Sequence, residues 1–427
     1  MKKFFTLILL LWALTLTSAT NPELAEIRYK PGALRIDLIL AGDQQTTTAY
    51  LDDLYHEPYW SGSPDNMIDP LGFGSFRVKV FSEASGDLLY SNGFSTLFQE
   101  WQTTAEAREI RRSFDQVVRV PFPLEKVRIH VLERLRNGDF AEVISIPVDP
   151  ADMFIKRNQY VPHPVTRVAG NGDPASSLDL VFVAEGYLAD QMGKFRQDVL
   201  EMAEYILQQP PFDAYRDQIN FWAVESPSAE AGPSNPGEDF YNRTPAGTTY
   251  YSLGLDRYLT TSRHGRLMDV AANAPGDVIC VLVNTEAYGG GGIYNAHVVG
   301  TADHPWSKVV FIHEIGHGLA GLGDEYFGSE VAYEEFYPLH VEPWEANLTT
   351  LVDFGSKWQD MLDEDTPVPT PATDEYLETV GVFEGGGYTA EGVYRPHIHC
   401  RMRSNTAPGF CPVCRKAIAR VIETYTK

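Results

Sequence analysis

Hydrophobic and polar residues alternate along the chain from residue 20 to about residue 155. The segment LRIDLIL (34–40) places an apolar side chain at every second position, which is typical of a strand with one buried face. The same period of two recurs in FRVKVF (76–81), VVRVPF (117–122), VRIHVLERL (127–135) and EVISIPV (142–148). Several short strands at this spacing predict a β-sandwich over residues 20–155. The polar segment TTAEAREIRRSF (103–114) interrupts them and is predicted to be helical.

The pattern changes after residues 150–175, which are rich in proline and glycine and are interpreted as a linker. LDLVFVAEG (178–186) is a near-continuous apolar run, as expected of a strand buried on both faces. Further strands are predicted at INFWAV (219–224) and VICVLVN (278–284). Residues 160–427 are therefore expected to form an α/β domain behind the all-β domain, in a multi-domain α+β chain.

Two helices are predicted within this second domain. In residues 192–206 the apolar residues recur three and four positions apart: Met192, Phe195, Val199, Met202 and Ile206. A second helix is predicted over residues 305–322, with Pro305 near its start.

The N-terminal residues have the pattern of a signal peptide. Lys2 and Lys3 precede an apolar run at residues 4–16, and the small residues Thr17 and Ala19 suit cleavage after Ala19. We expect residues 1–19 to be removed and the mature protein to be secreted, periplasmic or on the cell surface. Stable insertion into a membrane is not expected, because the rest of the sequence has no apolar segment of membrane-spanning length.

Charge and length narrow the class of protein further. The 427 residues carry a formal net charge of -24, which repels phosphate backbones and argues against nucleic-acid partners. A chain of this length is expected to hold two or three domains. Neither number indicates an oligomeric state.

Three of the four cysteines are close together in the sequence. Cys280 lies in a predicted buried strand and is expected to be a core thiol. Cys400, Cys411 and Cys414 predict one disulfide in an oxidising compartment, from Cys400 to one of the other two. The alternative is a structural zinc site that combines these thiols with His397 or His399.

The segment VVFIHEIGHGLAGLGDEYF (309–327) carries the strongest chemical signal. His313 and His317 are four positions apart and share one helical face, so their imidazoles can converge on one Zn²⁺ ion. Glu314 follows the first histidine and suits a general base that takes a proton from zinc-bound water. The other helical residues are mostly apolar, and burying such polar groups among them without a shared partner would be costly.

A catalytic zinc needs a third protein ligand. Gly321 and Gly323 can end the helix and reverse the chain, which would bring Asp324 back to the ion. Glu325 is the adjacent alternative, and Glu334 and His340 are more distant candidates. The preferred metal ligands are therefore His313, His317 and Asp324.

The motif HEIGHGLAGLGDEY, with Met402 downstream in CRMRS, resembles the metzincin-like zinc peptidases and most closely the IgA metallopeptidase family. The stretches VFVAEGY, QPPFDAY, VGVFEGGGY, GVYRP and GFCPVC fit the same family. The resemblance implies an N-terminal β-sandwich, a metzincin-like catalytic domain, zinc held by His313, His317 and Asp324, and Glu314 as base. It also implies that Met402 forms an apolar turn beneath the metal.

The sequence departs from the general metzincin pattern in its spacing and in its third ligand. The spacer after His313 is one residue longer, and an aspartate replaces the usual histidine. No tyrosine stands two residues after Met402, so Tyr326 and Tyr388 are candidates for stabilising an oxyanion, with packing as the alternative role.

Two glycine-rich segments are candidates for contact with substrate. AYGGGGIYNAHVVG (287–300) predicts a loop and an edge strand on which an extended peptide could pair. VFEGGGYTAEGVYRPH contains Glu384, Arg395 and His397, which could line the cleft, although ordinary turn chemistry also explains its glycines.

The function that these features favour is a secreted zinc metalloendopeptidase that hydrolyses extracellular proteins. The name of the family that the chain resembles makes immunoglobulin A a candidate substrate, beside other glycoproteins. One alternative is a surface binding or adhesion protein with a non-catalytic metal site, which an intact Glu314 disfavours. Another is a metal enzyme that acts on a non-peptide amide. Residues 20–155 show no catalytic group, so a fragment that begins near residue 160 is expected to fold alone.

Overall fold

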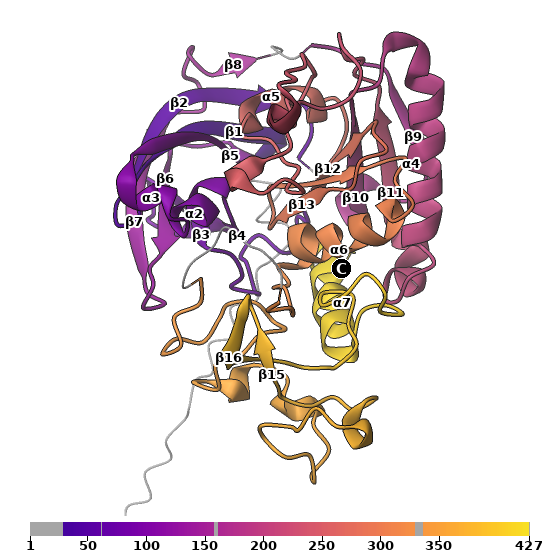
Figure 1. The fold of residues 1–427 in the computed structure, drawn as a ribbon. Coiled ribbons are helices and arrows are strands. Elements are labelled where there is room, and N and C mark those ends of the chain that lie inside the picture. Colours follow the sequence, from indigo (N-terminus) through magenta and orange to yellow (C-terminus); the bar gives the residue numbers. More distant parts are fainter. Residues whose placement is uncertain (1–28, 61, 158–160, 329–335, 427) are drawn as a thin grey trace, which may run out of the picture.

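The computed structural model describes residues 29–60, 62–157, 161–328 and 336–426 (Figure 1). The predicted signal peptide at residues 1–19 and the candidate ligand Glu334 lie outside these residues. Within the described residues, no helix combines the length and the apolar character that crossing a bilayer requires.

The N-terminal half of the described chain contains two four-stranded sheets (Figure 1). One sheet has the strand order β5-β1-β2-β8 and the other has the order β4-β3-β6-β7. Val78 and Ile129 from the second sheet belong to the same buried cluster as Leu34 and Leu38 from the first. The alternating apolar positions therefore fill one core between two sheets, as the pattern predicted. The strand bounds are β1 Tyr29–Gly42, β2 Thr47–Glu57, β3 Phe76–Ser82, β4 Leu88–Phe94, β5 Arg112–Pro123, β6 Val127–Arg134, β7 Phe140–Val148 and β8 Lys156–Arg157.

The helix predicted over residues 103–114 is wrong in its extent. The helical residues are α2 (Leu97–Gln102) and the single turn α3 (Glu106–Glu109). From Arg112 the chain runs in β5, where Phe114 pairs with Leu40 of β1 and is buried in the sandwich core. Pairing with a neighbouring strand outweighs the weak helical preference of the sequence here.

The second half is built on a six-stranded sheet in the order β13-β14-β12-β10-β11-β9. The inner strands β14, β12, β10 and β11 are parallel, and the edge strands β13 and β9 are antiparallel to their neighbours. The bounds are β9 Val165–Ala169, β10 Leu178–Glu185, β11 Ile219–Val224, β12 Val278–Val283, β13 Gly290–Ile293 and β14 His297–Thr301. The segment interpreted as a linker (150–175) thus contributes β8 to one sheet and β9 to another.

Helices cover both faces of this sheet. The helices are α4 (Met192–Ile206), α5 (His264–Ala271), α6 (Ser307–Ala320) and α7 (Pro412–Thr426). Along β10, Leu180 and Phe182 pack in the cluster under α4, α6 and α7, while Val181 and Val183 pack in the cluster under α5. The prediction that β10 is buried on both faces is confirmed, because every residue of the strand is buried.

The two long helices predicted from the sequence are present. Helix α4 has the predicted bounds, and α6 is two residues shorter at each end than predicted. The remaining elements are the hairpin β15 (Phe383–Gly386) and β16 (Thr389–Arg395), which lies below and to the left of α7 in Figure 1. Short 3-10 turns lie at Pro174–Ser176, Ala189–Gln191, Phe212–Gln218, Pro236–Glu238, Ser252–Gly254, Phe354–Ser356, Gln359–Met361 and Asp374–Tyr376.

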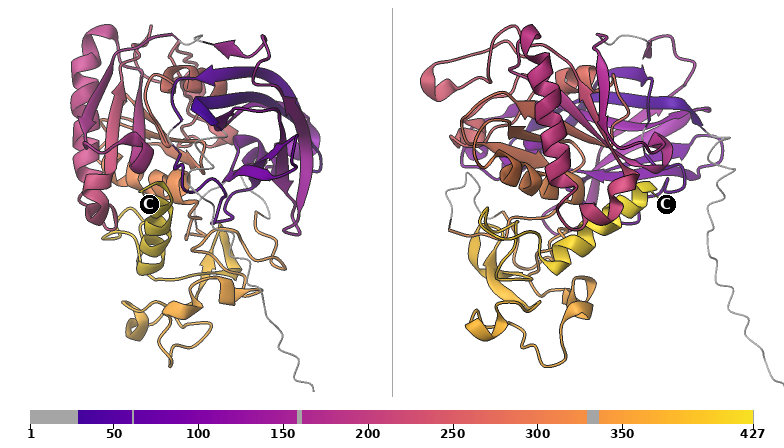
Figure 2. Two further views of the ribbon diagram at one scale, coloured as in Figure 1. Left: turned by 180° about the vertical axis from the view of Figure 1, so that it is seen from behind. Right: turned by 90° about the vertical axis from the view of Figure 1, so that its right-hand side faces the viewer.

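The β-sandwich contacts the α/β part through both hydrogen bonds and apolar packing. Arg35 on β1 is 3% exposed and donates to Asp269 Oδ1 at 2.7 Å and to the Gly265 carbonyl at 3.0 Å. The Val117 N–H donates to His264 Nδ1 at 3.2 Å, and the Val117 side chain lies in the cluster under α5. In Figure 2 the indigo sheets and α4 lie on opposite sides of the six-stranded sheet. A fragment from residue 160 would expose this interface, which argues against the expectation that it folds alone.

Replacing Phe311 by alanine tests how α6 is held. The Phe311 ring is fully buried and lies 5.4 Å from the Phe182 ring, centroid to centroid. The variant should lower the free energy of unfolding by about 3–5 kcal/mol in urea titrations, because it leaves a cavity between helix and sheet. Phe154→Ala is the matched control: its side chain is 80% exposed, so a change beyond about 0.5 kcal/mol is not expected. Equal losses in both variants would contradict this packing.

Candidate active site

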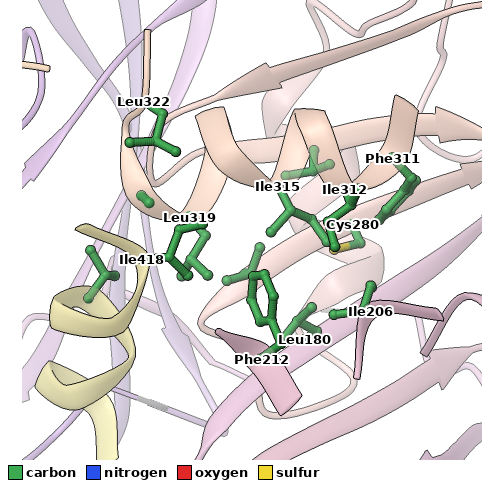
Figure 3. Packing of buried hydrophobic residues seen from close by; sticks show 14 of the residues in the cluster. Leu180, Ile206, Phe212, Cys280, Phe311, Ile312, Ile315, Leu319, Leu322 and Ile418 are labelled. Atoms are coloured by element: carbon green, nitrogen blue, oxygen red, sulfur yellow. The ribbon is translucent and has the colours of Figure 1, made fainter. Parts of the chain in front are cut away.

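Helix α6 is held by an apolar side that faces the sheet. Phe311, Ile312, Ile315 and Leu319 point into the core, towards Cys280 of β12 and Ile418 of α7 (Figure 3). Cys280 is fully buried there, which confirms that it is a core thiol. The packing fixes the rotation of α6 about its axis, so the polar residues of the motif emerge together on its other side.

Three potential metal-binding atoms converge beside the helix. His313 Nε2 lies 3.0 Å from His317 Nε2 and 3.1 Å from Asp324 Oδ1. His317 Nε2 lies 3.4 Å from the same carboxylate oxygen. Three ligands bonded to one ion at about 2.0–2.1 Å in tetrahedral geometry are separated by similar distances. The structure thus brings together the three residues that the sequence predicted as ligands.

The other nitrogen of each imidazole, Nδ1, is hydrogen-bonded to a backbone carbonyl. His313 Nδ1 lies 3.0 Å from the Arg401 carbonyl, and His317 Nδ1 lies 2.6 Å from the Leu322 carbonyl. A carbonyl can only accept, so each Nδ1 carries a proton, and each Nε2 is left to bind either a proton or a metal ion. The two Nε2 atoms and the Asp324 carboxylate face one another, an arrangement that a cation between them stabilises.

A sharp turn after α6 places Asp324. Gly321 has the left-handed φ of 57°, which glycine adopts without strain, and the Leu322 N–H donates back to the Gly316 carbonyl at 3.0 Å. Asn347 then brackets Gly323, accepting from its N–H and donating to its carbonyl, both at 2.8 Å. The predicted chain reversal is therefore present, and it buries the Asp324 carboxylate.

Tyr388 holds the carboxylate of Asp324 in place. Its hydroxyl donates to Asp324 Oδ2 at 2.7 Å, which leaves Oδ1 buried, facing the imidazoles, and without a hydrogen bond of its own. The hairpin turn also grips the backbone, because the Gly387 N–H donates to the Asp324 carbonyl at 2.8 Å. An orphaned carboxylate oxygen beside two lone pairs fits a divalent metal ion.

The electrostatics of the cluster favour positive charge. Burial disfavours a charged His317, but the adjacent Asp324 outweighs burial and raises the pKa of His317 to about 9. Burial alone would raise the pKa of Asp324, yet the two imidazoles hold that pKa well below its usual range. Protons and metal ions therefore compete for the same place, as at other sites with histidine ligands.

Glu314 lies beside the converging atoms without being one of them. Burial raises the pKa of its carboxyl, against the opposing attraction of His313 and His317. Gly290 of β13 lies so close that a Cβ on it would be 3.0 Å from Glu314 Oε1. A carboxylate with a raised pKa, next to a cation site, is suited to accept and return a proton.

The site opens into a cleft with walls from several elements. Its lining includes Glu314 and His317 of α6, Gly290–Gly292 of β13, and Tyr326. The β-sandwich forms part of the wall through Gln99, Glu100, Arg134, Leu135 and Arg136. Sequence reasoning missed this contribution, because it depends on how the two parts pack and no local motif signals it.

The predicted edge strand is present as β13. Its outer edge is partly occupied within the chain, since Tyr258 forms an isolated bridge with Gly290 and the Leu259 N–H donates to the Gly290 carbonyl at 3.3 Å. The Tyr258 hydroxyl is anchored in turn on Glu100 Oε2 at 2.6 Å.

Several candidate residues lie elsewhere. Glu325 is fully buried and faces away from the imidazoles, and His340 is exposed and outside the converging group. Among the residues that line the described cleft, none is Glu384, Arg395 or His397. Arg395 donates to the Glu384 carbonyl at 2.6 Å, so it fastens the hairpin.

The cysteine predictions need correction. Cys280, Cys400, Cys411 and Cys414 are free thiols in the structure, so the predicted disulfide from Cys400 is not formed. The alternative zinc site with His397 or His399 is also not formed as predicted, because in the described residues the three clustered thiols meet Glu325. The two histidines are engaged with each other, the His399 N–H donating to His397 Nδ1 at 3.0 Å.

Met402 packs beneath the site, against α6. Met402 is fully buried, and a Cβ on Gly316 would lie 2.6 Å from its Sδ and 3.2 Å from the Phe410 ring. The Glu325 N–H donates to the Met402 carbonyl at 2.9 Å, which ties the turn after α6 to the same segment. The glycine between the two histidines of the motif thus lies where α6 and Met402 approach each other closely.

Replacing Gly316 by alanine should push α6 away from Met402. We expect the free energy of unfolding to fall by about 1–3 kcal/mol, because the added methyl has no room. Gly328→Ala is the control, since a methyl added there would meet nothing within 4 Å and the φ of Gly328 is not in the left-handed region. Thermal and urea unfolding of both variants measure the difference, and an unchanged Gly316→Ala variant would contradict the close contact.

Comparisons with known families agree with this organisation. A family model described as IgA Peptidase M64 matches residues 166–379 and 372–422. A second model, described as Peptidase M64 N-terminus, matches residues 26–145. No curated protein matches the chain significantly.

Proposed function

The chain belongs to the IgA peptidase M64 family, and we propose that it is a zinc-dependent endopeptidase of extracellular proteins. The observation that carries the proposal is the convergence of His313, His317 and Asp324 beside Glu314 in an open cleft. Three protein ligands with room for a further one distinguish a catalytic zinc from a closed structural site.

Zinc is the metal that suits this set of donors. Two imidazole nitrogens and one carboxylate oxygen are borderline ligands that Zn²⁺ accepts readily in tetrahedral geometry. When bound, Zn²⁺ supplies Lewis acidity that polarises a carbonyl oxygen and lowers the pKa of a water molecule to about 7. His313, His317 and Asp324 would hold the ion.

Side chains of the protein would carry out the proton transfers. Glu314 takes a proton from the attacking water and returns it to the leaving amine, which its raised pKa favours. Tyr388 acts through Asp324 as a positioning residue, since its hydroxyl is already committed to that carboxylate. Tyr326 lines the cleft and remains the candidate for stabilising an oxyanion.

The substrate is proposed to be a protein or glycoprotein with an extended segment. The cleft lies between the β-sandwich and α6, so the sandwich would help to position a large substrate at the site. The part of β13 beyond Gly290 offers backbone groups at the edge of the sheet, where a peptide could pair. The family description names immunoglobulin A, which makes it the first substrate to assay. Secretion through residues 1–19 would bring the enzyme to such substrates.

Replacing Glu314 by glutamine should abolish hydrolysis while the metal stays bound. The amide keeps the shape of the carboxylate but cannot accept the proton, so the rate should fall by at least about 10²–10⁴-fold. Cleavage of casein and of immunoglobulin A, together with zinc content, measures both effects. Phe154→Ala, whose side chain is exposed and outside the cleft lining, is the control, and parental activity in Glu314→Gln would refute the mechanism.

Asp324 and Tyr388 should differ in how strongly they affect zinc affinity. Asp324→Ala removes a ligand and should weaken binding far more than Tyr388→Phe, which removes only the hydrogen bond to Oδ2 and should cost about 10–100-fold. Competition with a chelator measures both constants, and Tyr376→Phe, outside the cleft lining, is the control. If Asp324→Ala loses no more zinc to the chelator than the parent chain does, that residue is excluded as a ligand.

A further inference from the structure

A second cluster of side chains that could ligate a metal ion lies next to the turn that carries Asp324. Glu325, Cys400, Cys411 and Cys414 each offer one ligand atom, and these atoms all lie within 4.8 Å of one another. All four residues are buried, with 3% exposure for Cys411 and none for the other three. None of them faces the catalytic cleft.

The spacing of the sulfur atoms fits one shared ion better than a disulfide. Cys400 Sγ lies 3.6 Å from Cys414 Sγ. Two thiolates bonded to one zinc at about 2.3 Å in tetrahedral geometry lie about 3.8 Å apart, whereas the sulfurs of a disulfide are about 2.05 Å apart. A disulfide between any two of the thiols would also leave the third one buried beside a carboxylate.

The Glu325 carboxylate faces this cluster with one oxygen, and its other oxygen is buried without a hydrogen bond. Its Oε1 accepts from Asn347 Nδ2 at 2.9 Å and lies 3.2 Å from Cys414 Sγ, while its buried Oε2 accepts no hydrogen bond. The neighbouring cation, Arg395, donates to the carbonyls of Glu384 and Gly385. A fully buried carboxylate with an unpaired oxygen is costly unless a cation completes its surroundings.

The four residues come from three segments that surround the active site. Glu325 follows Asp324 in the turn after α6, and Cys400 lies two residues before Met402. Cys411 and Cys414 stand at the start of α7, on either side of its first residues. A common ion would therefore fasten the third candidate ligand of the catalytic metal to α7 and to the segment beneath α6.

We propose that Glu325, Cys400, Cys411 and Cys414 bind a structural Zn²⁺ ion in a closed tetrahedral site. Three thiolates and one carboxylate fill all four positions of the ion, so this site leaves none for substrate. Thiolates favour zinc over the hard cations Mg²⁺ and Ca²⁺. The assignment does not depend on the catalytic metal, because the two sites share no ligand.

Zinc analysis of the full chain after dialysis against metal-free buffer tests the proposal. We expect two zinc ions per wild-type chain and one in the His313→Ala/His317→Ala variant, where only the cysteine site remains. Adding Cys414→Ser to that variant should remove the remaining zinc. Cys280→Ala in the same background is the matched control, since this buried thiol lies outside the cluster, and it should keep the ion.

Two measurements on the His313→Ala/His317→Ala variant keep the test decisive if Cys414→Ser fails to fold. Loading with Co²⁺ should produce an intense thiolate-to-metal charge-transfer band. All four cysteines should be alkylated in denaturant with chelator and without reductant, because none is oxidised. Absence of zinc and of the cobalt band, or alkylation of only two cysteines, would overturn the proposal. If the wild-type chain holds one zinc ion, and replacing Cys414 removes it while replacing His313 and His317 does not, the cysteine site is supported. The proposed catalytic metal is then contradicted instead.

Discussion

The structure depends on burying both sides of one short helix. The apolar side of α6 fills the space between the six-stranded sheet and α7, through residues such as Phe311 and Ile315. The other side carries the His313 and His317 imidazoles and the Glu314 carboxylate into the cleft, where they are largely buried and unpaired polar groups are costly. Each imidazole therefore donates to a backbone carbonyl, and their remaining nitrogens converge with Asp324. Packing fixes the helix, and the metal-binding geometry follows from that.

Patterns within short stretches of sequence predicted the helices and strands that form from local spacing of apolar residues. Apolar periodicity identified α4, α6 and the buried strand β10, because each buries a face whose spacing is visible in the sequence. The motif placed His313 and His317 four residues apart, and the glycines after them predicted the reversal at Asp324. The strand pairing of β5 with β1 could not be anticipated in the same way, because it overrides the local preference of residues 112–114.

Features that depend on contacts between distant segments could not be predicted from local sequence patterns. Tyr388 reaches Asp324 from a hairpin that lies 64 residues away in sequence. The sequence leaves the role of Tyr388 open between chemistry and packing, and no spacing rule distinguishes the two. The wall that the β-sandwich gives the cleft depends likewise on buried contacts such as Arg35 with Asp269. Three nearby cysteines suggested a disulfide, since the sequence does not reveal that Glu325 completes their group.

The turn after α6 explains why two adjacent acidic residues can serve different purposes. Backbone hydrogen bonds hold this segment on both sides: the Gly387 N–H donates to the Asp324 carbonyl, and the Glu325 N–H donates to the Met402 carbonyl. A backbone fixed in this way sends consecutive side chains in opposite directions, as in a strand. Asp324 consequently faces the imidazoles, and Glu325 faces the thiols. A rotation of the backbone at Asp324 and Glu325 would move both side chains at once. The geometry of both clusters therefore depends on this one segment being held in place.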